Sequence, residues 1–181
     1  MIRRINFVGG PGCGKSTNAA KVFAMMKGEY SVELVTEYVK GWAYESRQIY
    51  PYDQVYFFGK QMNREYTVLE KGRVDTIITD SPLILQIAYA ERSGLPKSTI
   101  DSMLVILEEY EKTYPGLYIY LNRSGKDYID EGRYENLQQA KEMDDIIKGM
   151  MNDADIDYLE VKWDKADIMY GLIEREITGD V

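Results

Sequence analysis

The sequence predicts an α/β fold, in which a parallel β-sheet is covered by helices on both faces. Short apolar runs of strand length alternate along the chain with longer segments of helical periodicity. A glycine-rich segment, GGPGCGKST at residues 9–17, lies between the first apolar run and the first helical segment. Alternation of this kind is typical of parallel sheets, whose ligands bind where the carboxyl ends of the strands meet loops. We therefore expect the chemistry to lie directly after the strands.

Each predicted strand is a short apolar run, rich in β-branched or aromatic residues and bounded by turn residues. The predicted strands are 2–8, 31–35, 74–79, 117–121 and 158–161. The predicted helices between and after them are 16–26, 53–71, 83–92, 99–112, 136–151 and 165–177. Within 53–71, the residues expected to share the buried face are Val55, Phe58, Met62, Tyr66 and Leu69.

The composition limits the class of protein. With 181 residues, of which 45% are hydrophobic, the chain can bury one core, and we expect a single domain over residues 1–181. No apolar segment has the length needed to span a bilayer, which predicts a soluble, cytoplasmic protein without a membrane partner. The single cysteine excludes an internal disulfide, and the absence of histidine means that a general base has to be a carboxylate.

The charge of the chain is unevenly distributed. A formal net charge of -8 argues against a general coat of nucleic acid. The first 27 residues nevertheless contain no acid and carry Arg3, Arg4, Lys15, Lys21 and Lys27. This pattern leaves two interpretations open, a local nucleic-acid groove and ordinary solvated faces.

The glycine-rich segment has the P-loop pattern, Gly9-x-x-x-x-Gly14-Lys15-Ser16, in the context of a strand before it and a helix after it. Gly12 and Gly14 let the backbone curl, so that successive N–H groups point at phosphate oxygens. Lys15 would reach the β- and γ-phosphates of ATP, and the Ser16 hydroxyl would bind Mg²⁺. The pattern therefore predicts a nucleoside triphosphate site, although not which reaction takes place there.

Two further residues of this segment are expected in the nucleotide contact. Thr17 would support the α-phosphate side. Cys13 is close to the N-terminus of the following helix, where amide dipoles favour a thiolate. We predict that bound nucleotide shields this thiol from reagents. The alternative is a small buried side chain that no reagent reaches.

Acidic residues follow the third and second predicted strands. Asp80 closes the apolar run of TIITDSPL, as a Walker B acid does, and would hold Mg²⁺ directly or through water; a cap for the helix near Pro82 is the alternative. Glu37 lies just beyond Val35 and would accept a proton from an acceptor hydroxyl. Glu33 shares its side-chain face along the strand. Glu33 and Asp80 stay alternative bases, and a solvated loop acid is the alternative for Glu37.

Cationic side chains follow the fourth predicted strand. The segment LNRSGKDYIDEGRYENLQQA carries Arg123, Lys126 and Arg133 among glycines and acids. Such side chains would close over the triphosphate, stabilise charge on the transferring group and exclude water. Arg133, which follows a glycine, is the first choice. An exposed polar loop is the alternative.

The helix expected at 53–71 carries amides and aromatic residues that would form a wall of an acceptor pocket. Gln54 or Gln61 would hydrogen-bond to a base, and Arg64 is a further candidate on the same helix. Aromatic neighbours would stack on the base, although core or surface packing is the more frequent role for such side chains.

Several segments together resemble the P-loop family of NadR-type ribosylnicotinamide kinases and the related small phage ATPases or kinases of the AAA type. These segments are GGPGCGKST, TEYVKGWAYE, DQVYFFGKQ, TIITDSPL and YIDEGRYENLQQAKEMDDII. The resemblance covers most of the chain in the same order. It implies the nucleoside and nucleotide kinase fold, a three-layer sandwich with strand order 2-3-1-4-5 and a lid at about 122–135. It also supports the roles given above to Lys15, Ser16, Glu37, Asp80 and Arg133.

The chain departs from ribosylnicotinamide kinases in two ways. The adenylyltransferase domain of those proteins has no counterpart here, and TDSPL replaces another acidic sequence, so a nicotinamide acceptor does not follow. Phage kinases that phosphorylate 5-hydroxymethyluracil within DNA are similar in size and motif layout.

The resemblance thus implies a phage-encoded kinase in the host cytoplasm, dependent on ATP and Mg²⁺. Its acceptor would be a hydroxyl of a nucleoside, a nucleotide or a 5-hydroxymethyluracil base in DNA. Two alternatives stay open. One is a nucleotide-dependent ATPase or switch protein without a small-molecule acceptor, and the other is a P-loop protein that binds nucleotide without turnover. The choice between ATP and GTP and the oligomeric state are not predicted.

Overall fold

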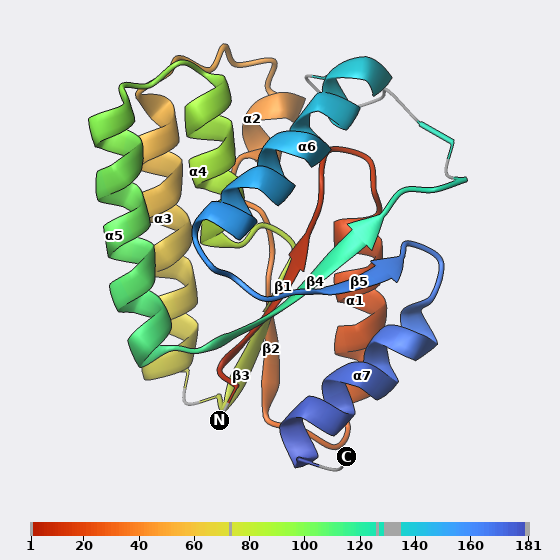
Figure 1. Cartoon of the computed structure of the whole chain (residues 1–181). Helices are drawn as coiled ribbons and strands as arrows, with labels where there is room; N and C mark the ends of the chain where they lie inside the picture. The colour runs from red at the N-terminus through yellow and green to blue at the C-terminus, as the bar shows by residue number, and fades with distance from the viewer. Residues whose placement is uncertain (1, 73, 126, 129–134, 180–181) are drawn as a thin grey trace.

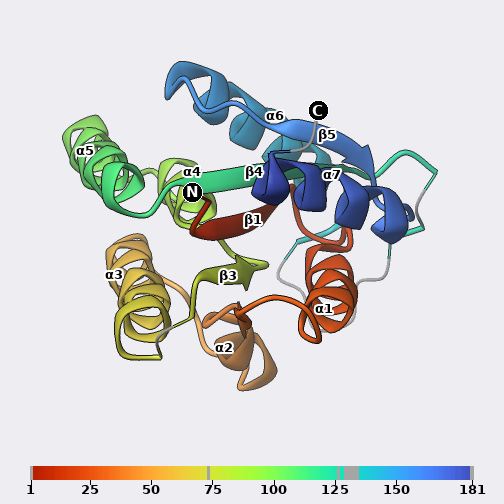
Figure 2. The same ribbon diagram turned by 90° about the horizontal axis from the view of Figure 1, so that it is seen from below.

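A five-stranded sheet in the order β2-β3-β1-β4-β5 forms the centre of the computed structural model, and every strand pair is parallel (Figure 1). The structure describes residues 2–72, 74–125, 127–128 and 135–179. Helices pack on both faces of the sheet (Figure 2). The predicted α/β class and the strand order are confirmed.

The elements follow one another much as predicted. The strands are β1 (Arg4–Val8), β2 (Val32–Val35), β3 (Thr76–Thr79), β4 (Gly116–Asn122) and β5 (Leu159–Lys162). The helices are α1 (Lys15–Met26), α2 (Lys40–Tyr44), α3 (Asp53–Tyr66), α4 (Leu83–Arg92), α5 (Lys97–Thr113), α6 (Leu137–Asp153) and α7 (Ala166–Thr178). The short helix α2 had no counterpart in the prediction.

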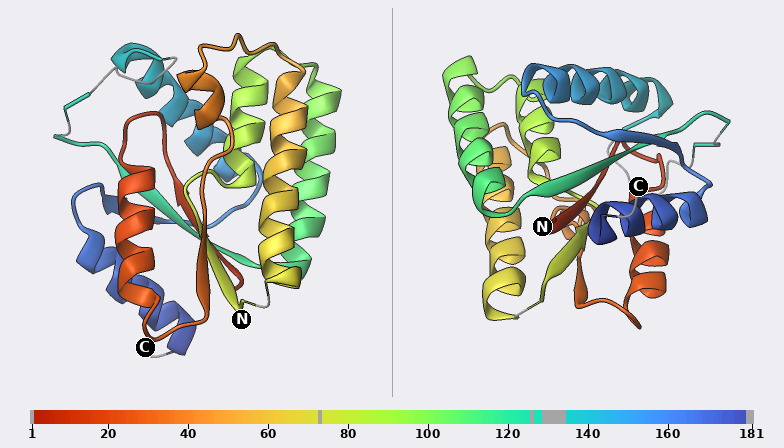
Figure 3. Two further views of the ribbon diagram at one scale, coloured as in Figure 1. Left: turned by 180° about the vertical axis from the view of Figure 1, so that it is seen from behind. Right: turned by 60° about the horizontal axis from the view of Figure 1, so that its bottom comes forward.

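The two helical layers enclose separate apolar clusters. Helices α1 and α7 lie together on one side of the sheet, where Val22, Met169 and Ile173 pack against Phe7 and Ile119 of the strands (Figures 2 and 3). Helices α3 to α6 cover the other side with a larger cluster. None of the described helices is both long and apolar enough to cross a membrane. The carboxyl ends of the strands face the end of the molecule that also carries α2 (Figure 1).

Helix α3 differs from its predicted form in length and in orientation. It ends at Tyr66, and a π-helical turn (Thr67–Lys71) continues the segment. Val55 and Tyr66, both predicted to be buried, are 39% and 43% exposed. The buried residues of α3 are Gln54, Phe57, Phe58, Gln61 and Glu65. The prediction was correct for Phe58 and Leu69, which are both 3% exposed, and wrong for Val55 and Tyr66, because the buried face also carries polar groups.

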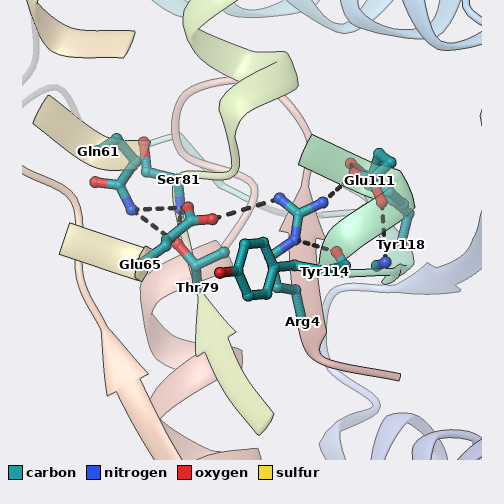
Figure 4. Close-up of polar contacts among 9 residues, drawn as sticks. Arg4, Gln61, Glu65, Thr79, Ser81, Glu111, Tyr114 and Tyr118 are labelled. Carbon is teal, nitrogen blue, oxygen red and sulfur yellow. Dashed lines mark hydrogen bonds and ion pairs between the residues drawn. The ribbon is translucent and has the colours of Figure 1, made fainter. Parts of the chain in front are cut away.

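Two of these polar residues, Glu65 and Gln61, belong to a hydrogen-bond network around Arg4, a buried arginine of β1 (Figure 4). Arg4 has no exposed surface and donates hydrogen bonds to the carbonyl oxygen of Tyr114 at 2.8 Å, to Oε2 of Glu65 at 3.4 Å and to Oε1 of Glu111. Gln61 Nε2 continues the network, donating to Glu65 Oε1 at 3.2 Å. The network ties α3, β1 and α5 together. Because Arg4 is buried and paired, the basic N-terminal segment is not a continuous surface patch.

Candidate active site

The P-loop joins the end of β1 to the start of α1, and its shape depends on glycine. Gly9, Gly12 and Gly14 have φ angles of 138°, 78° and 99°, a region that side chains with a Cβ rarely adopt. A Cβ on Gly9 would also lie 2.8 Å from Sγ of Cys13 and 3.2 Å from the carbonyl oxygen of Leu121. The motif glycines therefore produce the curled backbone that the sequence predicts.

Lys15 lies at the first position of α1, with its ammonium group inside the curve of the loop. Its Nζ donates to the carbonyl oxygens of Gly9 at 2.7 Å and Gly10 at 3.0 Å. Ser16 and Thr17 follow on the first turn, and both are exposed and line a cavity. The predicted phosphate-binding residues are thus brought together around one opening.

Cys13 belongs to this loop, but it does not line the cavity, although its Sγ lies 4.0 Å from Nζ of Lys15. The side chain has no exposed surface and packs in the apolar cluster under α1. The alternative given for this residue, a small buried side chain, therefore describes it. Any contact of Cys13 with nucleotide has to come from its backbone N–H group.

The ends of β2 and β3 place two carboxyl groups next to the loop. The backbone N–H of Glu37 donates to Oδ1 of Asp80 at 2.8 Å, and Asp80 is 3% exposed. Asp80 does not cap α4, because Pro82 occupies the N-cap position and no side chain caps that helix. Burial raises the pKa of the Glu37 carboxyl; Lys15 opposes this rise, and the Asp80 carboxylate adds to it.

Glu33 is not part of this arrangement. Its Oε2 accepts a hydrogen bond of 2.9 Å from Nζ of Lys27, and it is not among the residues that line the cavity. Of the three acids left open for the base, Glu37, Glu33 and Asp80, only Glu37 lines the cavity.

The cavity has a volume of about 670 Å³ and extends from the P-loop to helices α2, α3 and α4. Its lining residues include Gly12, Lys15 and Ser16 of the P-loop segment, Glu37 of the loop after β2, and the amides Gln54 and Gln86. A volume of this size is in the range of small-molecule sites. It gives space for a second ligand beside the triphosphate.

The three candidate acceptor residues of the 53–71 segment have different positions. Gln54 is 7% exposed and lines the cavity, as predicted. Gln61 lies two turns further along α3, where its Nε2 donates to Thr79 Oγ1 at 3.3 Å within the buried network (Figure 4). Arg64 does not line the cavity either. The structure therefore corrects the pattern-based grouping, because Gln61 shares the buried face of Gln54 but lies two turns away from the cavity, and of the three only Gln54 lines it.

Helix α4 contributes residues that the sequence analysis missed. Gln86, Tyr89 and Arg92, spaced three apart on one helical face, all line the cavity. Gln86 is 4% exposed, and its Nε2 donates to Ser81 Oγ at 2.8 Å. A glutamine inside the apolar run LILQIAYA was the available signal, because a buried amide needs polar partners.

Arg123 links the P-loop to helix α6 through hydrogen bonds. It donates to Oδ2 of Asp144, to the carbonyl oxygen of Pro11 at 3.0 Å and to that of Ala140 at 3.2 Å. Asp144 Oδ1 in turn accepts a 2.7 Å hydrogen bond from the N–H of Gly10. This geometry differs from the predicted closure over the triphosphate, because the donors of Arg123 already have protein acceptors. Lys126 and Arg133 lie outside the described residues.

The oxygen donors near the loop fit a Mg²⁺ ion that is shared with phosphate. Among the described residues, no group of three or more histidine, cysteine or acidic side chains is arranged to hold a metal ion alone. Mg²⁺ commonly uses one or two carboxylates together with substrate phosphates and water. The Ser16 hydroxyl and the Asp80 carboxylate are a donor set of this kind.

Comparison with known proteins agrees with this geometry. A family model described as an AAA domain matches residues 4–168. A solved thymidylate kinase from Ehrlichia chaffeensis has a TM-score of 0.68 to this chain at 14% sequence identity, covering 97% of this chain and 98% of that chain. Identity at this level shows the shared P-loop kinase-like fold and not a shared substrate. A search of curated proteins found no match.

Proposed function

Because this chain belongs to the AAA domain family, and its fold is that of a P-loop kinase, we propose that it is a kinase dependent on ATP and Mg²⁺. It transfers the γ-phosphoryl group to a hydroxyl of a nucleoside, a nucleotide or a 5-hydroxymethyluracil base in DNA. The observation that carries the proposal is the single cavity that is lined by the P-loop, by Glu37 and by the buried amides Gln54 and Gln86. The phage source and the modified-base acceptor come from the sequence resemblance alone.

The donor half of the cavity would bind the triphosphate. The backbone N–H groups of the P-loop and the positive end of α1 attract phosphate oxygens, and Lys15 adds a mobile cation. Ser16 and Asp80 would hold Mg²⁺, which neutralises charge on the β- and γ-phosphates when it is bound. Arg133 stays a proposed cation of the lid, whereas Arg123 would keep the loop in its curled shape.

The acceptor half would position the hydroxyl and remove its proton. Gln54 and Gln86 offer amide donors and acceptors to a base or sugar, and Tyr89 offers an aromatic surface. The acceptor oxygen attacks the γ-phosphorus, its proton passes to the Glu37 carboxylate, and the bond to the bridging oxygen of ADP breaks. Most of the rate enhancement in such a site comes from positioning and electrostatic stabilisation.

An acceptor screen with labelled ATP tests this proposal. The panel contains nucleosides, nucleoside monophosphates, plain DNA and DNA containing 5-hydroxymethyluracil. We expect label to move to one acceptor class, and we expect ATP consumption to rise when that acceptor is added. Release of inorganic phosphate that no acceptor stimulates would contradict the kinase and support the ATPase or switch protein. No ATP consumption under any condition would support binding without turnover.

A further inference from the structure

We propose that an aromatic and cationic patch beside the cavity binds a single strand of nucleic acid, so that the acceptor is a nucleotide within a strand. This inference rests on the proposed kinase function and narrows its acceptor. The patch is formed by the loop before α2, α2 itself, the segment after it and the exposed face of α3. Its residues are Tyr38, Trp42, Arg47, Tyr56 and Lys60.

The aromatic rings of the patch form a contiguous group. The ring centroids of Tyr38 and Tyr56 are 5.8 Å apart, and their hydroxyl oxygens are 3.0 Å apart. The Trp42 ring lies 6.4 Å from that of Tyr56 and packs edge-on against buried Phe57 at 4.9 Å. Phe57 thus anchors the group to the core, whereas Tyr56 remains 49% exposed. Such rings provide stacking surfaces for bases, whatever the base sequence.

Cations lie directly on these rings. The Arg47 guanidinium is 5.1 Å from the Trp42 ring centroid, and the Lys60 ammonium is 5.7 Å from that of Tyr38. Between residues 38 and 64 the cations are Lys40, Arg47, Lys60 and Arg64, and the acids are Asp53 and Glu45, of which Glu45 is ion-paired with Arg47 at 2.5 Å. This segment is therefore net positive in a chain of formal charge -8. Phosphates are attracted to such a segment.

The patch is continuous with the candidate active site. Helix α2 contributes Trp42 to the patch, and Lys40 and Ala43 to the cavity wall. The segment that follows brings Tyr50 to the cavity, and this ring is 59% exposed. A strand whose bases stack on the patch can therefore pass Tyr50 and place one unstacked nucleotide in the cavity, toward Glu37. Enzymes that modify bases bind their target out of the stack in this way.

The pairing of exposed rings with cations favours a nucleic acid over a protein partner. Single-strand binding sites combine aromatic stacking with positive charge along the backbone. An apolar protein surface would gain little from Arg47 and Lys60, which it would have to desolvate. The patch also lies beside a site that we propose to act on nucleotides, which agrees with a nucleic-acid ligand.

Fluorescence anisotropy with a labelled thymidine oligonucleotide of about 12 nucleotides, a length within single-strand site sizes, tests the patch without ATP. We expect Tyr56→Ala to weaken binding roughly 10-fold, because loss of one stacking ring typically costs that much or more. Lys60→Ala should reduce the salt dependence of log K by about 0.7, the share of one phosphate contact on a single strand. Tyr66→Ala is the matched control, since Tyr66 is exposed on the same helix and outside the patch.

Absence of binding at low salt, or equal weakening by Tyr56→Ala and Tyr66→Ala, would overturn the inference and leave a protein as the candidate occupant of the patch. Labelled ATP separates this failure from failure of the kinase proposal. Transfer to free nucleosides without oligonucleotide binding would refute only the strand-binding patch. Oligonucleotide binding through Tyr56 with no transfer to any acceptor would support the patch and refute the kinase.

Discussion

The backbone N–H of Glu37 donates a 2.8 Å hydrogen bond to Oδ1 of Asp80, although the residues are 43 positions apart in the chain. The bond fixes the loop after β2 to the end of β3. The bond uses the backbone of Glu37 and not its side chain. The Asp80 carboxylate therefore holds the loop in position, while the Glu37 side chain is part of the cavity lining. Each of the two carboxylates can therefore be tested without removing the other.

Glu37→Gln should reduce phosphoryl transfer by about 10²- to 10⁴-fold, the usual contribution of a general base. The amide keeps the size of the side chain and removes the proton acceptor, and the backbone bond to Asp80 does not depend on the side chain. Transfer rate and nucleotide affinity are measured on the same preparation. Glu33→Gln is the control, because Glu33 is paired with Lys27 away from the cavity and should retain full activity. If Glu37→Gln transfers at the wild-type rate, Glu37 is not the base.

Asp80→Asn should shift the Mg²⁺ requirement more than it shifts nucleotide affinity. An asparagine oxygen can still accept the N–H of Glu37, so the loop keeps its position, but the negative charge that attracts the cation is lost. Titration of activity with Mg²⁺ at saturating ATP gives the readout. An unchanged Mg²⁺ optimum would assign Asp80 a structural role only.

Lys15→Ala should abolish transfer while the protein remains folded. The ammonium group is the mobile cation of the P-loop, and its hydrogen bonds in this structure are to two loop carbonyls and not to core groups. Activity and thermal unfolding are compared with those of Lys21→Ala, whose side chain is exposed on α1. Loss of activity in both variants, or in neither, would contradict the P-loop assignment of Lys15.

The residues next to strand ends were predictable because the alternation of strands and helices fixes where the strands end. Lys15, Ser16, Glu37 and Asp80 each follow an apolar run, and a parallel sheet brings all such ends to one edge. Local spacing was therefore sufficient for this part of the site, even though the residues are distant in the chain.

Residues whose role depends on helix orientation were not predictable in the same way. The buried face of α3 carries the polar residues Gln54, Gln61 and Glu65. Hydrophobic periodicity therefore predicted that Val55 and Tyr66 are buried, whereas both are exposed. Burial of those polar groups is favourable only because tertiary partners, such as buried Arg4, form hydrogen bonds with them.

The support of the P-loop by Arg123 likewise depends on a long-range contact. Its partner Asp144 is on α6, and no local pattern links that carboxylate to the amide of Gly10. A cation after a strand end suggested contact with phosphate, which is the commoner role near a P-loop. The geometry shows instead a contact with the protein backbone.

Arg123→Ala should therefore weaken nucleotide binding, by roughly 10-fold, more than it slows transfer from bound nucleotide. Removal of the guanidinium leaves Asp144 without its ion-pair partner and Pro11 without a donor, so the loop loses its curled shape more readily. Calorimetric nucleotide affinity and the transfer rate at saturating ATP separate the two effects. Lys97→Ala, which breaks an exposed ion pair with Asp101 on α5, should change neither. A fall in transfer rate at unchanged affinity would restore the catalytic role first predicted for Arg123.

Arg4→Met should lower the free energy of unfolding by about 3–5 kcal/mol, the range for breaking a buried ion pair from one side. The substitution keeps an unbranched apolar chain in β1 but leaves Glu65 buried without its cation and the carbonyl of Tyr114 without its donor. Urea unfolding of wild type and variant measures the difference, and Arg3→Met is the control because Arg3 donates to two backbone oxygens and lies over the Tyr114 ring but pairs with no buried carboxylate. Adding Glu65→Gln to Arg4→Met should recover part of the loss, since the unpaired charge is then removed. Equal stability of Arg3→Met and Arg4→Met would show that the buried network contributes nothing specific to the fold.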